Sequence, residues 1–196
     1  MKQSRSSDTR KRIVNAAREL FQSKGFDGTS VAEICRTAGV SNGALFHQFP
    51  TKEALGFAVY SLIRAEFWDR IMVAMTTPDD PLDGVEAAVR AAFAFQQDDP
   101  GSSAFMFGVS GSKWIESFAN EAKEVHDAVS KRGQVWAKPH IDAGRLPSVE
   151  ADVFVALASG APQWLAQMNR IGMLTTSLDE IAELLPTYIR RAFTPQ

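Results

Sequence analysis

The side chains that could make specific polar contacts are concentrated between Ser30 and Lys52. Asn42 carries an amide that both donates and accepts hydrogen bonds, and His47 carries two ring nitrogens. An asparagine amide matches the N6 and N7 edge of adenine, whereas the Lys52 ammonium matches a phosphate. This set of residues indicates contacts with a nucleic acid rather than bond-breaking chemistry.

Residues typical of catalysis or metal binding form no pattern in this sequence. The three histidines, His47, His126 and His140, are dispersed, and Cys35 falls within a predicted helical corner. No metal-spaced cluster or Gly-rich phosphate loop occurs. His126 beside Asp127 could orient a polar ligand group, although a solvated helix face is the simpler explanation. We therefore expect no enzyme activity, no metal and no cofactor.

Two short helices across a glycine turn are predicted to position the polar residues. Ser30 followed by Glu33 is a capping box, which starts the first helix. Gly39 supplies the positive φ of a tight turn, and Ser41 can cap a second helix. The pattern predicts a helix-turn-helix. The N-terminal half of its second helix would present to the major groove Asn42, Gly43, Ala44 and His47.

Flanking helices are predicted on both sides of this corner. The preceding helix ends at Gly25 and should brace the other two, while residues 1–7 are expected to be disordered. Thr51 can cap a long helix that runs from Lys52 to about Met75. Ser30 and Lys52 would then lie at helix N-termini, where exposed N–H groups and an ammonium can hold phosphates.

With these residues in place, the segment TSVAEICRTAGVSNGALFHQFPTKEAL, preceded by TRKRIVNAARELFQSKGF, resembles the DNA-binding region of the TetR family of bacterial transcription regulators. The resemblance covers roughly the first quarter of the chain. It implies an all-α fold of about nine helices. A helix-turn-helix DNA-binding domain would occupy residues 1–51, and a ligand-binding and dimerisation domain residues 52–196.

The resemblance also implies which residues contact DNA. They are Ser30, Ser41, Asn42, Gly43, Ala44, Phe46, His47 and Lys52. In this family an aromatic residue, usually tyrosine, occupies the place of Phe46 and donates its hydroxyl to a phosphate. Phe46 has no hydroxyl, so only a packing role is predicted for it. The implied function is a homodimeric repressor that leaves a palindromic double-stranded DNA operator when a small effector binds. An activator, or an adaptor that kept the fold, is the alternative.

Two C-terminal segments have the composition of an interface. From Val153 to Met168 the only polar side chains are Ser159, Gln163 and Gln167, and a last helix should open at the capping box of Ser177 and Glu180. Proline at 162 and 186 is predicted to kink the two helices. They either fill the core of a larger bundle or form the four-helix dimer interface that the resemblance implies. The expected interface residues are Val153, Leu157, Trp164, Leu165, Met168, Ile181, Leu184, Leu185 and Tyr188.

Aromatic residues and methionines are abundant after the helix-turn-helix. At helical spacing they are typical of an ordinary core, but together they exceed what packing requires. In the TetR family the C-terminal helices enclose a small-molecule pocket, so we expect a mainly apolar or aromatic effector. The candidate lining residues are Phe67, Trp68, Met72, Phe93, Phe105, Phe107, Trp114, Phe118, Trp136 and Trp164.

Composition agrees with this division of roles. The 196 residues are 45% hydrophobic, typical of a globular protein. Residues 1–54 carry nine Lys and Arg against five Asp and Glu, whereas the rest carries 12 against 18, so the two parts have charges of +4 and −6. The N-terminus lacks the apolar run of a secretory signal, and no stretch is long enough to span a bilayer. We expect a cytoplasmic protein without membrane contact.

Overall fold

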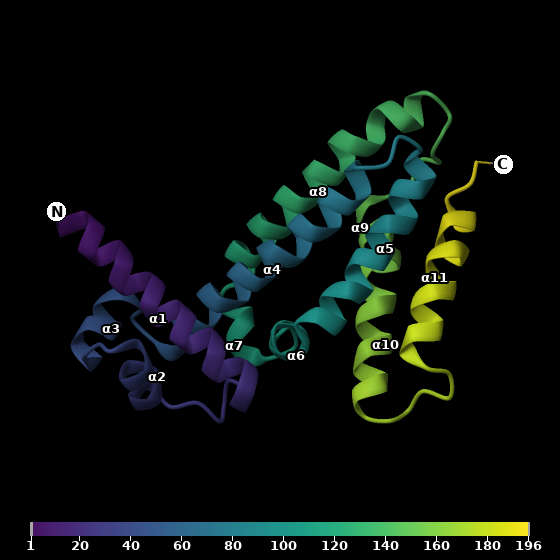
Figure 1. Ribbon diagram of the computed structural model, residues 1–196. Helices are drawn as coiled ribbons and strands as arrows, with labels where there is room; N and C mark the ends of the chain where they lie inside the picture. The colour runs from purple at the N-terminus through teal and green to yellow at the C-terminus, as the bar shows by residue number, and fades with distance from the viewer. Residues whose placement is uncertain (1, 196) are drawn as a thin grey trace. The chain divides into compact units, whose positions relative to one another are not determined.

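Every regular element of residues 2–195, the described part of the chain, is helical in the computed structural model (Figure 1). The helices form two compact units. Unit 1 contains the chain up to Arg64 together with Gly101–Ala122, and unit 2 contains Ala65–Pro100 together with the chain from Lys123 onward. Among the described residues, no helix combines the length and apolar character that crossing a membrane requires.

This division differs from the domain boundary expected after residue 51. The long helix α4 (Lys52–Thr76) contributes its first half to unit 1 and its second half to unit 2. The segment 101–122 lies far along the sequence, yet it belongs with the N-terminal helices. Its contacts with them are non-local, so no pattern within the segment reveals them.

Unit 1 is built around a small three-helix core. Besides the first half of α4, its helices are α1 (Lys2–Lys24), α2 (Val31–Ala38), α3 (Asn42–Gln48), α6 (Pro100–Val109) and α7 (Lys113–Glu116). α1 packs against both α2 and α3 and buries Ile13, Ile34 and Leu45 completely. Because α1 begins at Lys2, the expectation that residues 2–7 lie outside a helix was wrong.

Polar and aromatic contacts join α6 to α1 within unit 1. Arg18 Nη2 and Gln22 Nε2 donate hydrogen bonds to the buried Ser102 hydroxyl, at 3.1 and 2.6 Å. Between the same two helices, the rings of Phe21 and Phe105 stack with centroids 5.2 Å apart. A buried hydroxyl and an aromatic pair both need partners of fixed position. They therefore define where α6 sits against α1.

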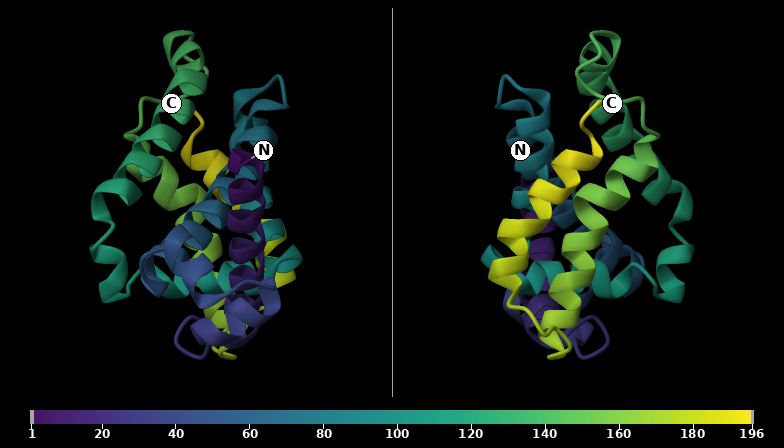
Figure 2. Two further views of the ribbon diagram at one scale, coloured as in Figure 1. Left: turned by 90° about the vertical axis from the view of Figure 1, so that its left-hand side faces the viewer. Right: turned by 90° about the vertical axis from the view of Figure 1, so that its right-hand side faces the viewer.

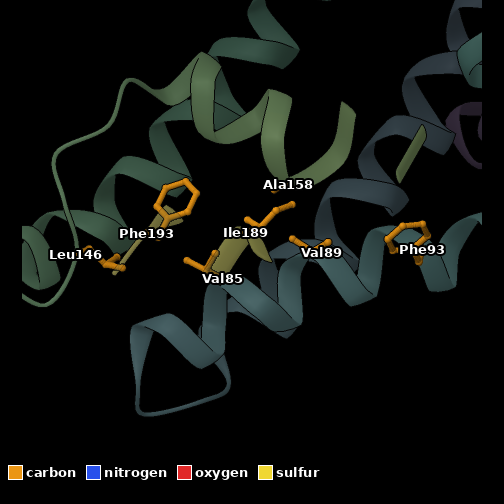
Figure 3. Close-up of a cluster of buried hydrophobic side chains, with 7 residues drawn as sticks. All are labelled: Val85, Val89, Phe93, Leu146, Ala158, Ile189 and Phe193. Carbon is orange, nitrogen blue, oxygen red and sulfur yellow. The ribbon is translucent and has the colours of Figure 1, made fainter. Parts of the chain in front are cut away.

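Unit 2 is a helical bundle around α5 (Pro81–Asp98). Besides the second half of α4, its other elements are α8 (Ala119–Asp142, from Lys123), α9 (Ala151–Val155), the π-helical turn η1 (Ala156–Gly160), α10 (Ala161–Arg170) and α11 (Leu178–Ala192). Both α10 and α11 pack against α5. Figure 3 shows their shared apolar cluster, which consists of Val85, Val89, Phe93, Leu146, Ala158, Ile189 and Phe193.

The π-helical turn η1 lies where the sequence predicts a kink at Pro162. Proline has no N–H, and its ring crowds the carbonyl four residues earlier, here Ala158. The chain responds by widening to a π-helical turn, in which Ser159 Oγ donates to the Val155 carbonyl at 2.8 Å. The helix therefore continues into α10. If residues 151–170 are taken as one helix, the described chain has ten helices, against about nine predicted.

Ion pairs align α5 with α11 at the surface of unit 2. Arg90 donates to Glu86 and to Glu183, each at 2.9 Å. In the last turn of α11, Arg190 donates a hydrogen bond to Asp83 of α5. Exposed pairs of this kind contribute only about 0–1 kcal/mol each. The buried apolar cluster holds the helices together, and these pairs favour one alignment of them.

Candidate functional site

The start of α2 carries the capping box that the sequence predicts. Ser30 Oγ accepts from the Glu33 N–H at 3.2 Å and donates to Glu33 Oε2 at 2.8 Å, while the Ser30 N–H donates to Oε2 at 3.0 Å. Lys24 Nζ lies 2.6 Å from Glu33 Oε1. The Lys24 hydrogen bond, followed by those from Ser30, lowers the pKa of Glu33 from 4.5 to about 2. The prediction of this cap is confirmed.

The same contacts limit what Ser30 can do for a ligand. Its hydroxyl already accepts one hydrogen bond and donates another within the cap. The Glu33 carboxylate occupies the N-terminus of α2, where a bound anion would otherwise sit. The sequence predicts a phosphate contact through the N–H groups at this helix N-terminus, and such a phosphate would have to compete with the Glu33 carboxylate.

The turn between α2 and α3 has the geometry that Gly39 permits. Gly39 adopts φ 64° and ψ 43°, in the left-handed region, and its N–H donates to the Arg36 carbonyl. The Val40 N–H donates to the Cys35 carbonyl at 3.0 Å. Cys35 is buried beneath the turn, and burial raises the pKa of its thiol. Cys35 therefore acts as a small neutral packing residue.

The helix α3 separates an anchored inner face from an exposed outer face. Ser41 Oγ caps the helix by accepting from the Ala44 N–H at 3.2 Å, and Leu45 is completely buried. The exposed residues are Ser41, Asn42, Gly43, Phe46 and His47, while Ala44 is half-buried. This arrangement places on one surface the residues predicted to read base edges.

Two residues of this outer face are not explained by the fold. A Cβ at Gly43 would contact only Ser41 Oγ, at 3.9 Å, so the fold does not require glycine there. Phe46 is 46% exposed, which means that its predicted packing role does not hold in the structure. An exposed phenylalanine and a vacant Cβ position both suit the close approach of another molecule.

Lys52 lies at the capped start of α4. Thr51 Oγ1 accepts from the Ala54 N–H at 3.0 Å, and the Lys52 ammonium lies 4.4 Å from the centroid of the Phe26 ring. Phe26 in turn stacks on Trp114 of α7, with centroids 4.7 Å apart. The ammonium is thus held near the start of α4 by an aromatic face, which leaves its N–H donors available to an anion.

Unit 2 contains a cavity of about 60 Å³. Of the ten candidate lining residues, it brings together Trp68, Met72 and Trp136. Phe67 and Phe93 are core residues instead. A separate cleft of about 320 Å³ in unit 1 is lined by Phe105 and Trp114. The structure therefore does not gather the ten residues around one pocket. The other three candidates do not line either space and are Phe107, Phe118 and Trp164.

Sequence reasoning missed the wall that α8 contributes to the cavity. Besides Val129 and Trp136, it consists of Ser130, Gly133, Gln134, Ala137 and Ile141. These positions recur at helical spacing on one face of α8, which was a detectable signal. The search for large aromatic residues passed over them because four of the five are small or polar.

An exposed apolar surface covers α9, η1, α10 and α11, of which α10 and α11 run side by side (Figure 2). The expected interface residues that are exposed are Val153, Leu157, Trp164, Leu184 and Tyr188. In contrast, Leu165, Ile181 and Leu185 pack against the core, and Met168 is half-buried. The sequence prediction missed Ile171 and Met173, which are exposed just after α10. We refer to the exposed residues together as the α10–α11 face.

A serine, a histidine and an aspartate meet beside the cavity without forming a catalytic triad. His126 Nε2 lies 3.0 Å from Asp152 Oδ1 and 3.5 Å from Ser130 Oγ. A triad needs the acid and the nucleophile on different ring nitrogens. Here both contact the same nitrogen, so His126 cannot take a proton from Ser130 while Asp152 orients it.

These features define a helix-turn-helix protein with a separate helical unit that contains a cavity. The family model for bacterial regulatory proteins of the tetR family matches residues 13–59, which include α2, the turn and α3. The chain is 47% identical over 53 residues to the transcriptional regulator UidR of Escherichia coli K12. That match covers 27% of this chain and 27% of UidR, so it spans only about a quarter of the relative.

Longer matches extend the likeness beyond the helix-turn-helix. The regulator RutR of Escherichia coli O157:H7 is 29% identical over 164 residues, which cover 81% of this chain and 75% of RutR. The crystal structure of a TetR family regulator from Marinobacter aquaeolei VT8 superposes with a TM-score of 0.74 over the whole of both chains. Its sequence identity is 19%, so this match shows the shared fold. The helix-turn-helix region of this chain is therefore similar to that of the TetR family of bacterial regulators, and the whole chain shares the fold of solved members of that family.

Proposed function

We propose that this protein is a sequence-specific DNA-binding transcriptional regulator whose α3 reads the major groove. The observation that carries the proposal is the outer face of α3. There Asn42, Gly43 and His47 are exposed, while Leu45 anchors the opposite face in the core. None of the three exposed residues is needed to build the helix corner. Their types match a partner that offers base edges and phosphates.

Each residue has a distinct role in this proposal. Asn42 pairs with the N6 and N7 edge of an adenine, and Gly43 lets the backbone approach the groove. The exposed Phe46 ring packs beside the DNA backbone at the edge of the groove. Lys52 holds a phosphate next to the groove and fixes the register of α3.

The proposed regulator acts as a homodimer through the α10–α11 face. One short helix binds DNA weakly, whereas a two-fold dimer presents two copies of α3 to a palindromic operator. The exposed Trp164, Leu184 and Tyr188 form an apolar surface of the kind that subunit interfaces cover.

A small effector in the unit 2 cavity would release this repressor from DNA. The cavity of about 60 Å³ is smaller than the roughly 300–1,000 Å³ of typical ligand pockets, so the effector must favour a conformation in which it is enlarged. Differential affinity for that conformation is what shifts the equilibrium. Because α4 supplies residues to the cavity and carries Lys52 at its start, it is the element that both events involve.

Fluorescence anisotropy tests the DNA-binding proposal. The probe is a duplex covering the DNA upstream of the protein's own gene, compared with a scrambled duplex at several salt concentrations. We expect selective binding whose log K falls steeply with log salt. Lys52→Ala should weaken binding to both duplexes and lower the salt slope by about one, whereas the exposed Lys131→Ala of unit 2 should not.

Equal and weak binding to both duplexes would count against a local operator. A selection from random DNA sequences would then decide between a distant operator and an adaptor. If that selection enriched no sequence, the proposal would fail. Transcription from the upstream promoter, with and without the protein, separates a repressor from an activator.

A further inference from the structure

The hydroxyl and amide side chains that line the unit 2 cavity are confined to one short stretch of α8. That stretch contributes Ser130 and Gln134, which lie one helical turn apart on either side of Gly133. The walls from α4, α5 and α9 carry apolar side chains, including Trp68, Met72, Val85 and Phe154. A ligand in this cavity therefore meets hydroxyl and amide side chains at one end only.

The contacts of Ser130 show which kind of polar group it offers. Its hydroxyl lies 3.5 Å from His126 Nε2, and that nitrogen lies 3.0 Å from Asp152 Oδ1. A carboxylate oxygen only accepts hydrogen bonds, so Nε2 carries a proton directed at Asp152 and cannot accept one from Ser130. The hydroxyl proton of Ser130 is therefore available as a donor to a group inside the cavity.

Among the described residues, the cavity has no charged side chain that could pair with a charged ligand. None of the residues that line it, all within the described chain, is Asp, Glu, Lys, Arg or His. An ion moved from water into an apolar site without a partner is strongly disfavoured. His126, which contacts Ser130, is already paired with Asp152. The selected ligand must therefore be neutral.

Gly133 marks where the body of a ligand can extend. A Cβ at this position would meet no atom within 4 Å, although the residue lines the cavity from the middle of α8. The present volume of about 60 Å³ is below the roughly 150 Å³ of an engineered cavity that binds benzene. Gln134 is exposed while lining the cavity, so the opening lies on this side.

We propose that this cavity selects a compact, neutral, mainly apolar molecule with one hydrogen-bond acceptor. The acceptor meets the Ser130 hydroxyl and the Gln134 amide, and the apolar body fills the space beside Gly133. The inference rests on the proposed effector-controlled function and specifies the chemical class of the effector.

Calorimetry with four isosteric para-tolyl compounds tests the inference on the full-length protein. 4-Methylacetophenone is neutral and offers a carbonyl acceptor. p-Cymene replaces the carbonyl group by an apolar one, 4-methylbenzoate replaces it by an anion, and 4-methylbenzamidinium replaces it by a cation. We expect the ketone to bind at least about ten-fold more tightly than each of the other three, because only the ketone satisfies the donors without burying a charge.

Three variants localise the binding to α8. Ser130→Ala should reduce the preference for the ketone over p-cymene to within about three-fold. Gly133→Leu should abolish binding of both, whereas Val135→Leu, at an exposed position of the same helix, should leave it unchanged. Thermal unfolding checks that each variant is folded, and Ala137→Leu provides a second blocking substitution if Gly133→Leu is not.

The inference is overturned if 4-methylbenzoate or the amidinium binds more tightly than the ketone, or if no compound binds. It is also overturned if Ser130→Ala keeps the full preference for the ketone. DNA binding is measured separately by anisotropy without any compound. Absence of DNA binding together with selective ketone binding would remove the proposed function and leave the cavity's ligand class standing.

Discussion

The outer face of α3 and the α10–α11 face are both exposed in the single chain, but their side chains differ in kind. α3 presents short polar side chains, a glycine and one aromatic ring. The α10–α11 face presents Trp164, Leu184 and Tyr188 instead. Neither set is needed to fill a core, since the cores of the two units are built from other residues.

The two sets of side chains fit different kinds of partner. Polar groups and a vacant Cβ position suit a hydrated, charged surface that offers hydrogen bonds, such as a DNA groove. Large apolar side chains gain free energy only when they leave water, which a second copy of the same face allows. Substitutions on one face should therefore leave binding to the partner of the other face unchanged.

Among these substitutions, Trp164→Arg should have the largest effect, which is loss of the dimer. Trp164 is 58% exposed in the single chain, so the substitution should not unfold it. Truncation or charge at a central interface aromatic costs about 2–4 kcal/mol, which weakens the dimer about 30- to 1,000-fold. Sedimentation should then show a monomer at micromolar concentration, and operator binding should lose its tight phase.

The control for this prediction is Val135→Arg, which places the same charge on an exposed part of α8. It should leave the dimer intact. Equal loss of dimer in both variants would mean that the α10–α11 face is not the interface. If the wild-type protein is a monomer at micromolar concentration, the dimer proposal itself fails.

Asn42→Ala, on the outer face of α3, should have the next largest effect, which is limited to operator affinity. Loss of a bidentate contact to a base costs about 1–3 kcal/mol of discrimination, or roughly five- to 150-fold in operator affinity. Binding to the scrambled duplex and the sedimentation of the dimer should not change. Asn120→Ala, at an exposed position of α8, is the matched control. A uniform loss on both duplexes would mean that Asn42 contacts the backbone and not a base.

Local signals in the sequence predicted the start of both faces. The Ser-x-x-Glu pattern at Ser30 and Glu33 gives the complete capping box of α2, and Ser177 caps α11 by accepting from the Glu180 N–H. The left-handed conformation at Gly39 was equally predictable. These features depend on residues within one helical turn, so a single sequence contains all the information that they need.

Features that depend on distant residues could not be predicted in this way. Phe105 packs on Phe21, and Trp114 packs on Phe26, although α4 and α5 separate the partners in sequence. Likewise, Phe93 and Trp68 have the same apolar character, but one is a core residue and the other lines the cavity. Only the packed structure distinguishes filled from unfilled space, because side-chain chemistry is the same in both.

Ser30→Ala should show whether the α2 cap affects operator binding without any change to the side chains of α3. Loss of an N-cap costs about 0.5–2 kcal/mol of stability, measured by denaturant unfolding. Ser177→Ala removes an equivalent cap from α11 and should cost a similar amount. Only Ser30→Ala should also reduce operator affinity at temperatures where both variants are folded. If both variants lower it equally, reduced stability explains the loss and the α2 cap has no specific role.

Phe46→Tyr, on the outer face of α3, should produce a small gain in DNA affinity. The Phe46 ring is exposed on the same face as Asn42, so an added hydroxyl can reach a phosphate if the ring lies beside the backbone. A new hydrogen bond of this kind is worth about 0.5–1.5 kcal/mol, or roughly two- to twelve-fold in affinity. The gain should appear on both duplexes, because phosphates carry no sequence. A loss confined to the operator would instead place the ring against a base.

The smallest effect is expected from the acid titration of Glu33 at the start of α2. Its pKa is about 2 in the folded chain against an ordinary 4.5, because Lys24 and Ser30 stabilise the carboxylate. Between these values the unfolded chain binds more protons, so stability rises with pH there. The contribution is complete above about pH 4.5 and is lost as the pH falls towards 2. The Glu33 side chain is partly exposed, so salt should weaken this contribution to stability.

NMR titration of the Glu33 carboxyl carbon measures this shift directly. Lys24→Ala removes the largest cause and should move the midpoint upward, towards the ordinary value of 4.5. An unchanged midpoint in that variant would mean that the capping hydrogen bonds from Ser30 alone hold the carboxylate. The α10–α11 face should keep its dimer throughout, since neither Lys24 nor Glu33 belongs to unit 2. A dimer that dissociated in Lys24→Ala at neutral pH would contradict the independence of the two faces.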